Sequence, residues 1–125
     1  MTATSGVPRE TWVVLLHRNE ESSLYEAAAM AAAASSLDVS VTLVWFDAAL
    51  DALVSGRLED SGDGTGAAEL LAGARETGRV RFLACSASAV RSEEGIGAVR
   101  DRVDDIVGWP TVVGLIRAAS KAFVW

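Results

Sequence analysis

The chain has 125 residues, a formal net charge of −6 at pH 7 and a single cysteine. Half of its residues are hydrophobic and 22% are charged, a composition typical of one globular domain and not of a disordered segment. The acidic balance argues against nucleic-acid and anionic-membrane partners, and a single cysteine excludes an internal disulfide. Because so low a cysteine content is typical of a reducing compartment, we expect a cytoplasmic protein with no membrane association.

The first part of the chain predicts two strands separated by a helix. Residues 1–9 contain serine, glycine and proline and predict a flexible N-terminal arm, which leaves residues 10–125 as the domain. Residues 11–16, TWVVLL, are continuously apolar and predict a buried strand. An alanine-rich helix follows and ends near Ser36. Residues 39–46, VSVTLVWF, alternate at first, which predicts a half-exposed strand.

The remainder continues the alternation of strands and helices. After a short helix, residues 57–66 predict a mobile connection of unassigned role and not a phosphate loop, because the glycine run follows a helix and lacks a Lys-Ser/Thr pair. Another helix leads to residues 80–84, which are mostly apolar and predict a buried strand that runs into the only cysteine. A short strand is expected within residues 103–107, then an apolar helix over 111–119 and a last strand over 121–125.

This alternation predicts a single-domain α/β fold with a five-stranded parallel sheet and helices on both faces. The half-polar strand at residues 39–46 favours an edge position, which gives the flavodoxin-like strand order 2-1-3-4-5. Strands 11–16 and 80–84 would then be neighbours, and ligands bind outside the carboxyl ends of strands where such a sheet reverses its order. His17 and Cys85, the only histidine and the only cysteine, would meet at that point.

Cys85 and His17 are the candidate catalytic residues. Small residues follow Cys85 and favour a tight turn into a helix, whose partial positive charge stabilises a thiolate. At a strand end its sulfur should be partly exposed, and His17 would pair with the thiolate or relay its proton. Ser86, Ser88 and Trp109 are the expected substrate-binding residues. Unpaired cysteine is also among the most buried residue types, which leaves a purely structural Cys85 as the alternative.

Other chemistries fit the sequence less well. The spacing from Cys85 to Arg91 matches a cysteine-phosphatase loop, but such loops use glycine to wrap the anion and this one has none. A phosphoacceptor domain would carry acidic residues where His17 and Cys85 stand, and a flavin site would need a phosphate loop richer in glycine and serine. One cysteine and one histidine with scattered carboxylates do not form a metal-binding pattern, so we expect no metal and no cofactor.

Several stretches together form a family pattern: TWVVLLH, the alanine-rich helix, VSVTLVWF, RVRFLAC and IVGWPTVVGLIRAASKAFVW. Over residues 10–125 this pattern resembles the DsrE/DsrF-like family of small sulfur-relay proteins, and the cysteine directly after an apolar strand is its most specific feature. The resemblance implies a cytoplasmic α/β subunit of a trimer or hexamer. It also implies that a cysteine matching Cys85 carries sulfur as a persulfide and passes it to the thiol of a partner protein.

The favoured hypothesis is therefore a sulfur-carrier or sulfurtransferase subunit that accepts sulfur on Cys85. The alternative is a non-catalytic oligomeric subunit, for assembly or for small-molecule binding, in which Cys85 is structural. A phosphatase-like enzyme that uses Cys85 and Arg91 is the third and weakest hypothesis. Four tryptophans in a chain of this size also favour a homo-oligomer, since not all of them can be central.

Overall fold

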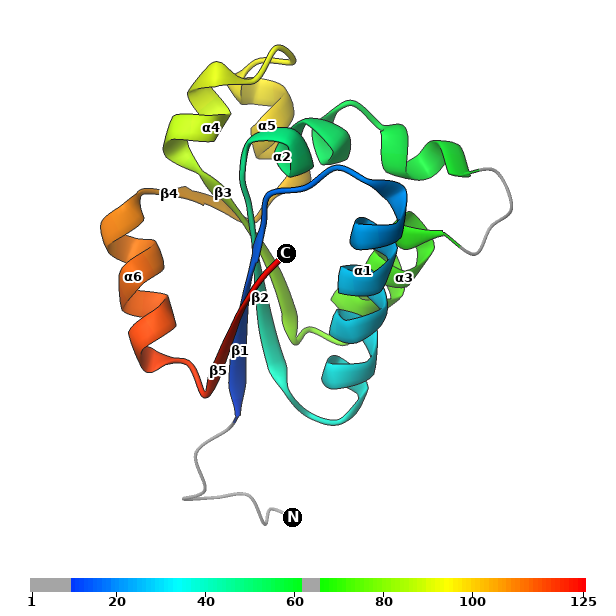
Figure 1. The fold of residues 1–125 in the computed structure, drawn as a ribbon, viewed down its shortest axis with the longest axis vertical. Coiled ribbons are helices and arrows are strands. Elements are labelled where there is room, and N and C mark those ends of the chain that lie inside the picture. Colours follow the sequence, from blue (N-terminus) through cyan, green and yellow to red (C-terminus); the bar gives the residue numbers. More distant parts are fainter. Residues whose placement is uncertain (1–9, 62–65) are drawn as a thin grey trace.

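The computed structural model describes residues 10–61 and 66–125, so the expected N-terminal arm and part of the expected mobile connection lie outside the described residues. Five parallel strands form a single sheet, which confirms the predicted α/β class (Figure 1). The strands are β1 (Thr11–Leu16), β2 (Ser40–Trp45), β3 (Val80–Cys85), β4 (Asp105–Val107) and β5 (Lys121–Val124).

Helices connect the strands and lie on both faces of the sheet, as predicted. They are α1 (Glu21–Ser36), α2 (Asp47–Val54), α3 (Ala67–Glu76), α4 (Ser86–Arg91), α5 (Ile96–Arg102) and α6 (Trp109–Ala118), with a 3₁₀ helix, η1 (Arg57–Ser61), after α2. Gly56 and Gly78 have φ of +83° and +78°, the left-handed conformation that commonly ends a helix, and they follow α2 and α3. No helix within the described ranges has the length and apolar character needed to cross a bilayer.

The strand order is β4-β3-β2-β1-β5, so the predicted order 2-1-3-4-5 is wrong. β2 lies between β1 and β3, and Leu43 pairs with Val14 on one side and with Phe82 on the other. Its polar residues, Ser40 and Thr42, occupy only the amino-terminal end, where they are half-buried. From Leu43 onward every side chain of β2 is buried, and this end holds β2 at the centre of the sheet.

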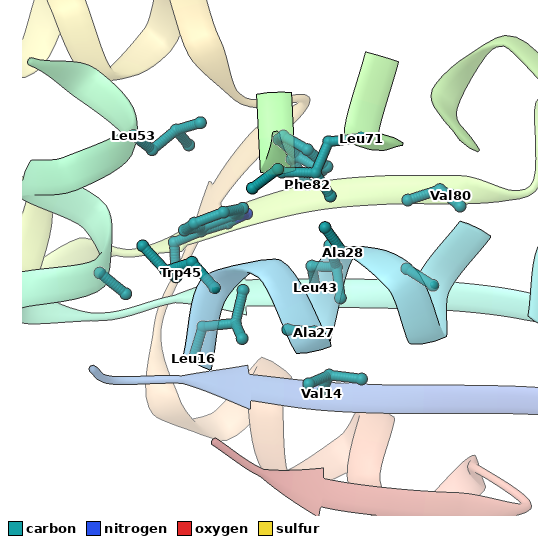
Figure 2. Packing of buried hydrophobic residues seen from close by; sticks show 14 of the residues in the cluster. Val14, Leu16, Ala27, Ala28, Leu43, Trp45, Leu53, Leu71, Val80 and Phe82 are labelled. Carbon is teal, nitrogen blue, oxygen red and sulfur yellow. The ribbon is translucent and has the colours of Figure 1, made fainter. Parts of the chain in front are cut away.

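One face of the sheet carries most of the core. Alternate side chains of the inner strands, such as Leu16, Trp45 and Phe82, pack there against α1, α2 and α3 (Figure 2). The buried residues of α1 are Leu24, Ala27, Ala28, Ala31, Ala34 and Ser35. Because most of them are alanines, the helix axis can approach the sheet closely.

The opposite face is covered by α6, the one described helix on that side (Figure 1). The second cluster of buried residues lies beneath it and consists of Val13, Leu15, Val44, Phe46, Leu83, Cys85 and Val112. Of the ten residues of α6, all of which the structure describes, only Val112 is fully buried. The two faces of the sheet therefore differ greatly in how much apolar surface their helices bury.

Asp104 fixes the short edge strand β4 to the rest of the sheet. Its Oδ2 accepts a hydrogen bond of 2.7 Å from the backbone N–H of Phe82, and its own N–H donates to the Phe82 carbonyl at 2.8 Å. Its other carboxylate oxygen accepts from Arg75 Nη2 at 2.9 Å. The Arg75 guanidinium also lies 4.2 Å from the centre of the Phe82 ring, so one cluster joins α3, β3 and β4.

Candidate functional site

The residues singled out from the sequence lie along the carboxyl edge of the sheet. His17 follows β1, Cys85 ends β3 and Trp109 begins α6 shortly after β4. Asp47 follows β2 at the same edge. Because all five strands are parallel, their carboxyl ends come together on one side, which is where open α/β sheets bind ligands.

Cys85 is buried, with 2% of its surface exposed, so the expectation of a partly exposed sulfur is wrong. The cause is the pleat of β3. Cys85 lies two residues after Leu83 and therefore points to the same face of the sheet, the face covered by α6. Val44, Phe46 and Val112 belong to the apolar cluster around it. As predicted, the chain turns from Cys85 directly into α4.

His17 and Cys85 do not meet, because β2 separates the strands that carry them. Two strand spacings place them roughly 10 Å apart along the edge. The His17 ring instead stacks on Phe46 at a centroid distance of 4.6 Å and an angle of 15°. Phe46 also stacks on Trp109, with centroids 5.1 Å apart. The predicted pairing of His17 with the Cys85 thiolate is therefore replaced by an aromatic stack that runs beside Cys85.

The two serines after Cys85 have different environments. Ser86 is exposed in the first turn of α4, and its hydroxyl lies close to Gly108, at the start of α6. Ser88 is buried, and its hydroxyl donates to Asp47 Oδ1 at 2.8 Å. Ser86 and the half-exposed Trp109 thus remain able to contact a substrate, whereas Ser88 holds α4 in place.

Asp47 is the site residue that sequence reasoning missed. Its φ of +42° is uncommon for a residue with a side chain, and Asp is one of the few types that tolerate that region. One carboxylate oxygen accepts from both Ser88 and Arg91, the latter at 2.6 Å, which ties α4 to the start of α2. Arg91 is therefore paired with a carboxylate through Nη2 and does not stand alone as the anion-binding cation that a phosphatase-like mechanism would use.

The same contacts control the ionisation of Asp47. The Ser88 hydroxyl, then the Arg91 guanidinium, hold the pKa of its carboxyl below the ordinary value of 3.8. A pKa that is lower in the folded state stabilises the folded protein above pH about 4, and this stabilisation is lost as the pH falls through the folded-state value. Because the pair is more than half exposed, its contribution is discounted to less than about 1 kcal/mol.

Asp47→Asn should therefore lower the free energy of unfolding slightly near neutral pH and have a smaller effect in acid. Urea unfolding at about pH 7 and about pH 3 measures the difference from the wild-type protein at each pH. Asp51→Asn, in the same helix but outside this network, is the control. If Asp47→Asn lowered the free energy of unfolding as much at the lower pH as at neutral pH, the lowered pKa of Asp47 would be contradicted.

A groove lies away from these residues. It measures about 1030 Å³ and is formed by the start of α1, by η1 and by the start of α3. Leu24, Leu58 and Ala67 contribute apolar surface, and Glu21 and Arg57 contribute charge. Cys85, His17 and Trp109 do not line it, so it gives no support to a role for Cys85.

The fold and this edge define a small α/β protein with an open parallel sheet, in which a cysteine ends an inner strand. The model of the DsrE/DsrF-like family matches residues 12–107, well over half of the chain, and the protein belongs to that family. This family is associated with sulfur relay. The matched range contains β1 to β4 and Cys85 and stops just before α6. No curated protein matches the chain.

Proposed function

We propose that the chain is a small cytoplasmic sulfur-carrier subunit that accepts sulfane sulfur on Cys85 as a persulfide. The observation that carries this proposal is the position of Cys85, at the carboxyl end of β3, in a chain of a family associated with sulfur relay. Ser86 and Trp109 are the neighbouring groups that face solvent and are proposed to contact the sulfur donor. Their hydroxyl and indole N–H can donate hydrogen bonds to it.

The transfer step is a thiolate attack on sulfur. The Cys85 thiolate attacks the outer sulfur of a hydropersulfide R–S–SH, a new S–S bond forms on Cys85, and the bond between the two donor sulfurs breaks. The donor leaves as the thiolate R–S⁻, and no external oxidant or reductant is needed. Attack on the outer sulfur of Cys85–S–SH by the thiol of a partner protein would complete the relay in the same way.

We further propose that the subunit assembles with copies of itself into a trimer or hexamer. The support lies at the β5 edge of the sheet, where Val124 is 74% exposed. Trp12, Phe123 and Trp125 form a half-buried aromatic cluster there, with centroid distances of 5.3 Å and 6.4 Å. Half-buried aromatic residues beside an exposed strand edge are common features of interfaces between subunits.

Incubation with a low-molecular-weight hydropersulfide should add one sulfur atom to the native protein. Intact-mass spectrometry measures the adduct, and a reductant should remove it. Cys85→Ser should abolish the adduct, because the chain contains no other cysteine. His17→Ala, which alters the edge without touching Cys85, is the control and should leave the final yield unchanged.

A second candidate function is favoured by the burial of Cys85. A side chain that is 2% exposed is what a structural cysteine in a non-catalytic assembly subunit would show. In that case the native thiol would resist both the persulfide donor and an alkylating reagent and would react with both once the protein is unfolded in urea. That outcome would reject the carrier function.

A further inference from the structure

Access to Cys85 is closed by a small number of side chains. The apolar cluster that buries Cys85 includes Val44 and Phe46, at the carboxyl end of β2, and Val112 of α6. Val107 of β4 packs against the same cluster. Val107 is also the strand partner of Cys85. A reagent can therefore reach the sulfur only after one of these groups has moved.

The elements on the other sides of Cys85 are held firmly. β3 is an inner strand with partners on both sides, and α4 is fastened to α2 by the bonds from Ser88 and Arg91 to Asp47. On the far face of the sheet, α1, α2 and α3 bury six, five and three residues, whereas α6 buries one. Opening at any of these three helices would break several buried contacts at once.

Among the helices, α6 is the one that packs over Cys85, and it is weakly attached. Val112 is its single fully buried residue, Leu115 and Ile116 are half-buried, and the other residues of this described helix are exposed. The residues at its two ends, Gly108 and Ala119, have extended backbone, so the helix is joined to β4 and β5 by short non-helical connections. Segments with few buried contacts open with the smallest free energies in native proteins.

We propose that α6 is a movable cover over Cys85, which opens while the sheet stays folded and is held closed by Val112 and by the stacking of Trp109 on Phe46. Its purpose rests on the proposed function, since a carrier must expose its sulfur in order to exchange it. The opening itself is a property of the fold and can be measured without any sulfur donor.

The test compares two valines that are both 0% exposed. Val112 lies in α6 over Cys85, and Val99 lies in α5 in the cluster on the opposite face of the sheet. Val112→Ala and Val99→Ala remove the same two methyl groups from equally buried positions. For each variant, the rate at which iodoacetamide labels native Cys85 is measured beside the free energy of unfolding in urea.

Val112→Ala should accelerate labelling by about tenfold, which corresponds to ~1.4 kcal/mol of weaker docking, and should raise the global unfolding constant by a similar factor, because its contacts are lost in both the locally open and the unfolded state. Val99→Ala should raise the global unfolding constant but leave the labelling rate near the wild-type value, because its contacts stay intact when α6 opens. In the wild-type protein, the labelling rate should depend only weakly on low urea concentrations, because local opening exposes little surface. If Val99→Ala accelerates labelling in proportion to its global unfolding constant, Cys85 is exposed by complete unfolding and the cover proposal is wrong.

Trp109 provides a second test that carries little risk to folding, because its side chain is 48% exposed. Trp109→Ala removes the contact with Phe46 and should accelerate labelling severalfold, whereas Trp109→Phe keeps a stacked ring and should stay near the wild-type rate. Equal rates in all three proteins would also overturn the proposal. If labelling depends on the opening of α6 but no persulfide adduct forms, the carrier function alone is rejected. If the adduct forms but labelling does not depend on α6, the cover proposal alone is rejected.

Discussion

Replacement of Trp45 by alanine is expected to lower the free energy of unfolding by about 3–5 kcal/mol, the range typical of a large buried aromatic residue. Trp45 is 1% exposed and belongs to the same core cluster as Leu53 of α2, and its ring centroid is 5.2 Å from that of Phe82 of β3 (Figure 2). Because native domains are stable by only about 5–15 kcal/mol, this loss could leave the variant partly unfolded at room temperature. Urea unfolding followed by circular dichroism measures it.

Trp45→Phe is the informative companion variant. The indole Nε1 of Trp45 is buried without a hydrogen-bond partner among the described residues, so phenylalanine removes an unsatisfied donor while it keeps an aromatic ring. The decrease in the free energy of unfolding should therefore be much smaller for Trp45→Phe than for Trp45→Ala. Trp109→Ala, at a half-exposed position, should also cost little. Equal losses at Trp45 and Trp109 would contradict the core described above.

Replacement of Asp104 by alanine should lower the free energy of unfolding by about 1–3 kcal/mol, since hydrogen bonds to charged groups contribute more stability than those between neutral groups. The change leaves the Phe82 N–H without its acceptor and Arg75 without its ion pair. Because Asp104 stands directly before β4, the edge strand should also loosen. Thermal unfolding measures the stability, and hydrogen exchange of the β4 amides measures the loosening.

Asp101→Ala is the matched control for Asp104. Asp101 is an exposed residue of α5 with no hydrogen bond or ion pair from its side chain to the described residues, and its loss should change stability by less than about 0.5 kcal/mol. Asp104→Asn should fall between the two, because its amide oxygen can still accept from Phe82. A cost for Asp104→Ala no greater than that for Asp101→Ala would contradict the anchoring role of the carboxylate.

The elements of the fold were predictable from the sequence because their signals are local. Apolar runs of strand length, helical spacing and glycine stops identified the strands and most of the helices. Strand order is a long-range property, and the prediction depended on the polar Ser40 and Thr42 at one end of β2. Those two residues lie at the amino-terminal end of β2, whereas its other end is buried on both faces. The polar character of one end was taken as a property of the whole strand, which placed β2 at the edge of the sheet.

For the candidate site, the sequence could predict its location at the carboxyl edge of the sheet but not the contacts between its residues. In a parallel sheet the residues after each strand gather on one side, which placed His17, Cys85 and Trp109 correctly at that edge. Which of them touch depends on the strand order, and which are buried depends on the position of α6. The role of Asp47 requires Ser88 and Arg91, about forty positions further along the chain, which no local pattern connects to it.

The pairing of β5 with β1 sets a condition on the synthesis of the protein. The backbone N–H of Ser120 donates to the Thr11 carbonyl, and these residues stand 109 positions apart. At roughly 5–20 residues per second, a ribosome needs on the order of ten seconds to cover that distance. Until then the outer edge of β1 on the nascent chain has no strand beside it, and an unpaired apolar edge is a template for aggregation. The newly made chain thus depends on β5 to cover this edge of β1.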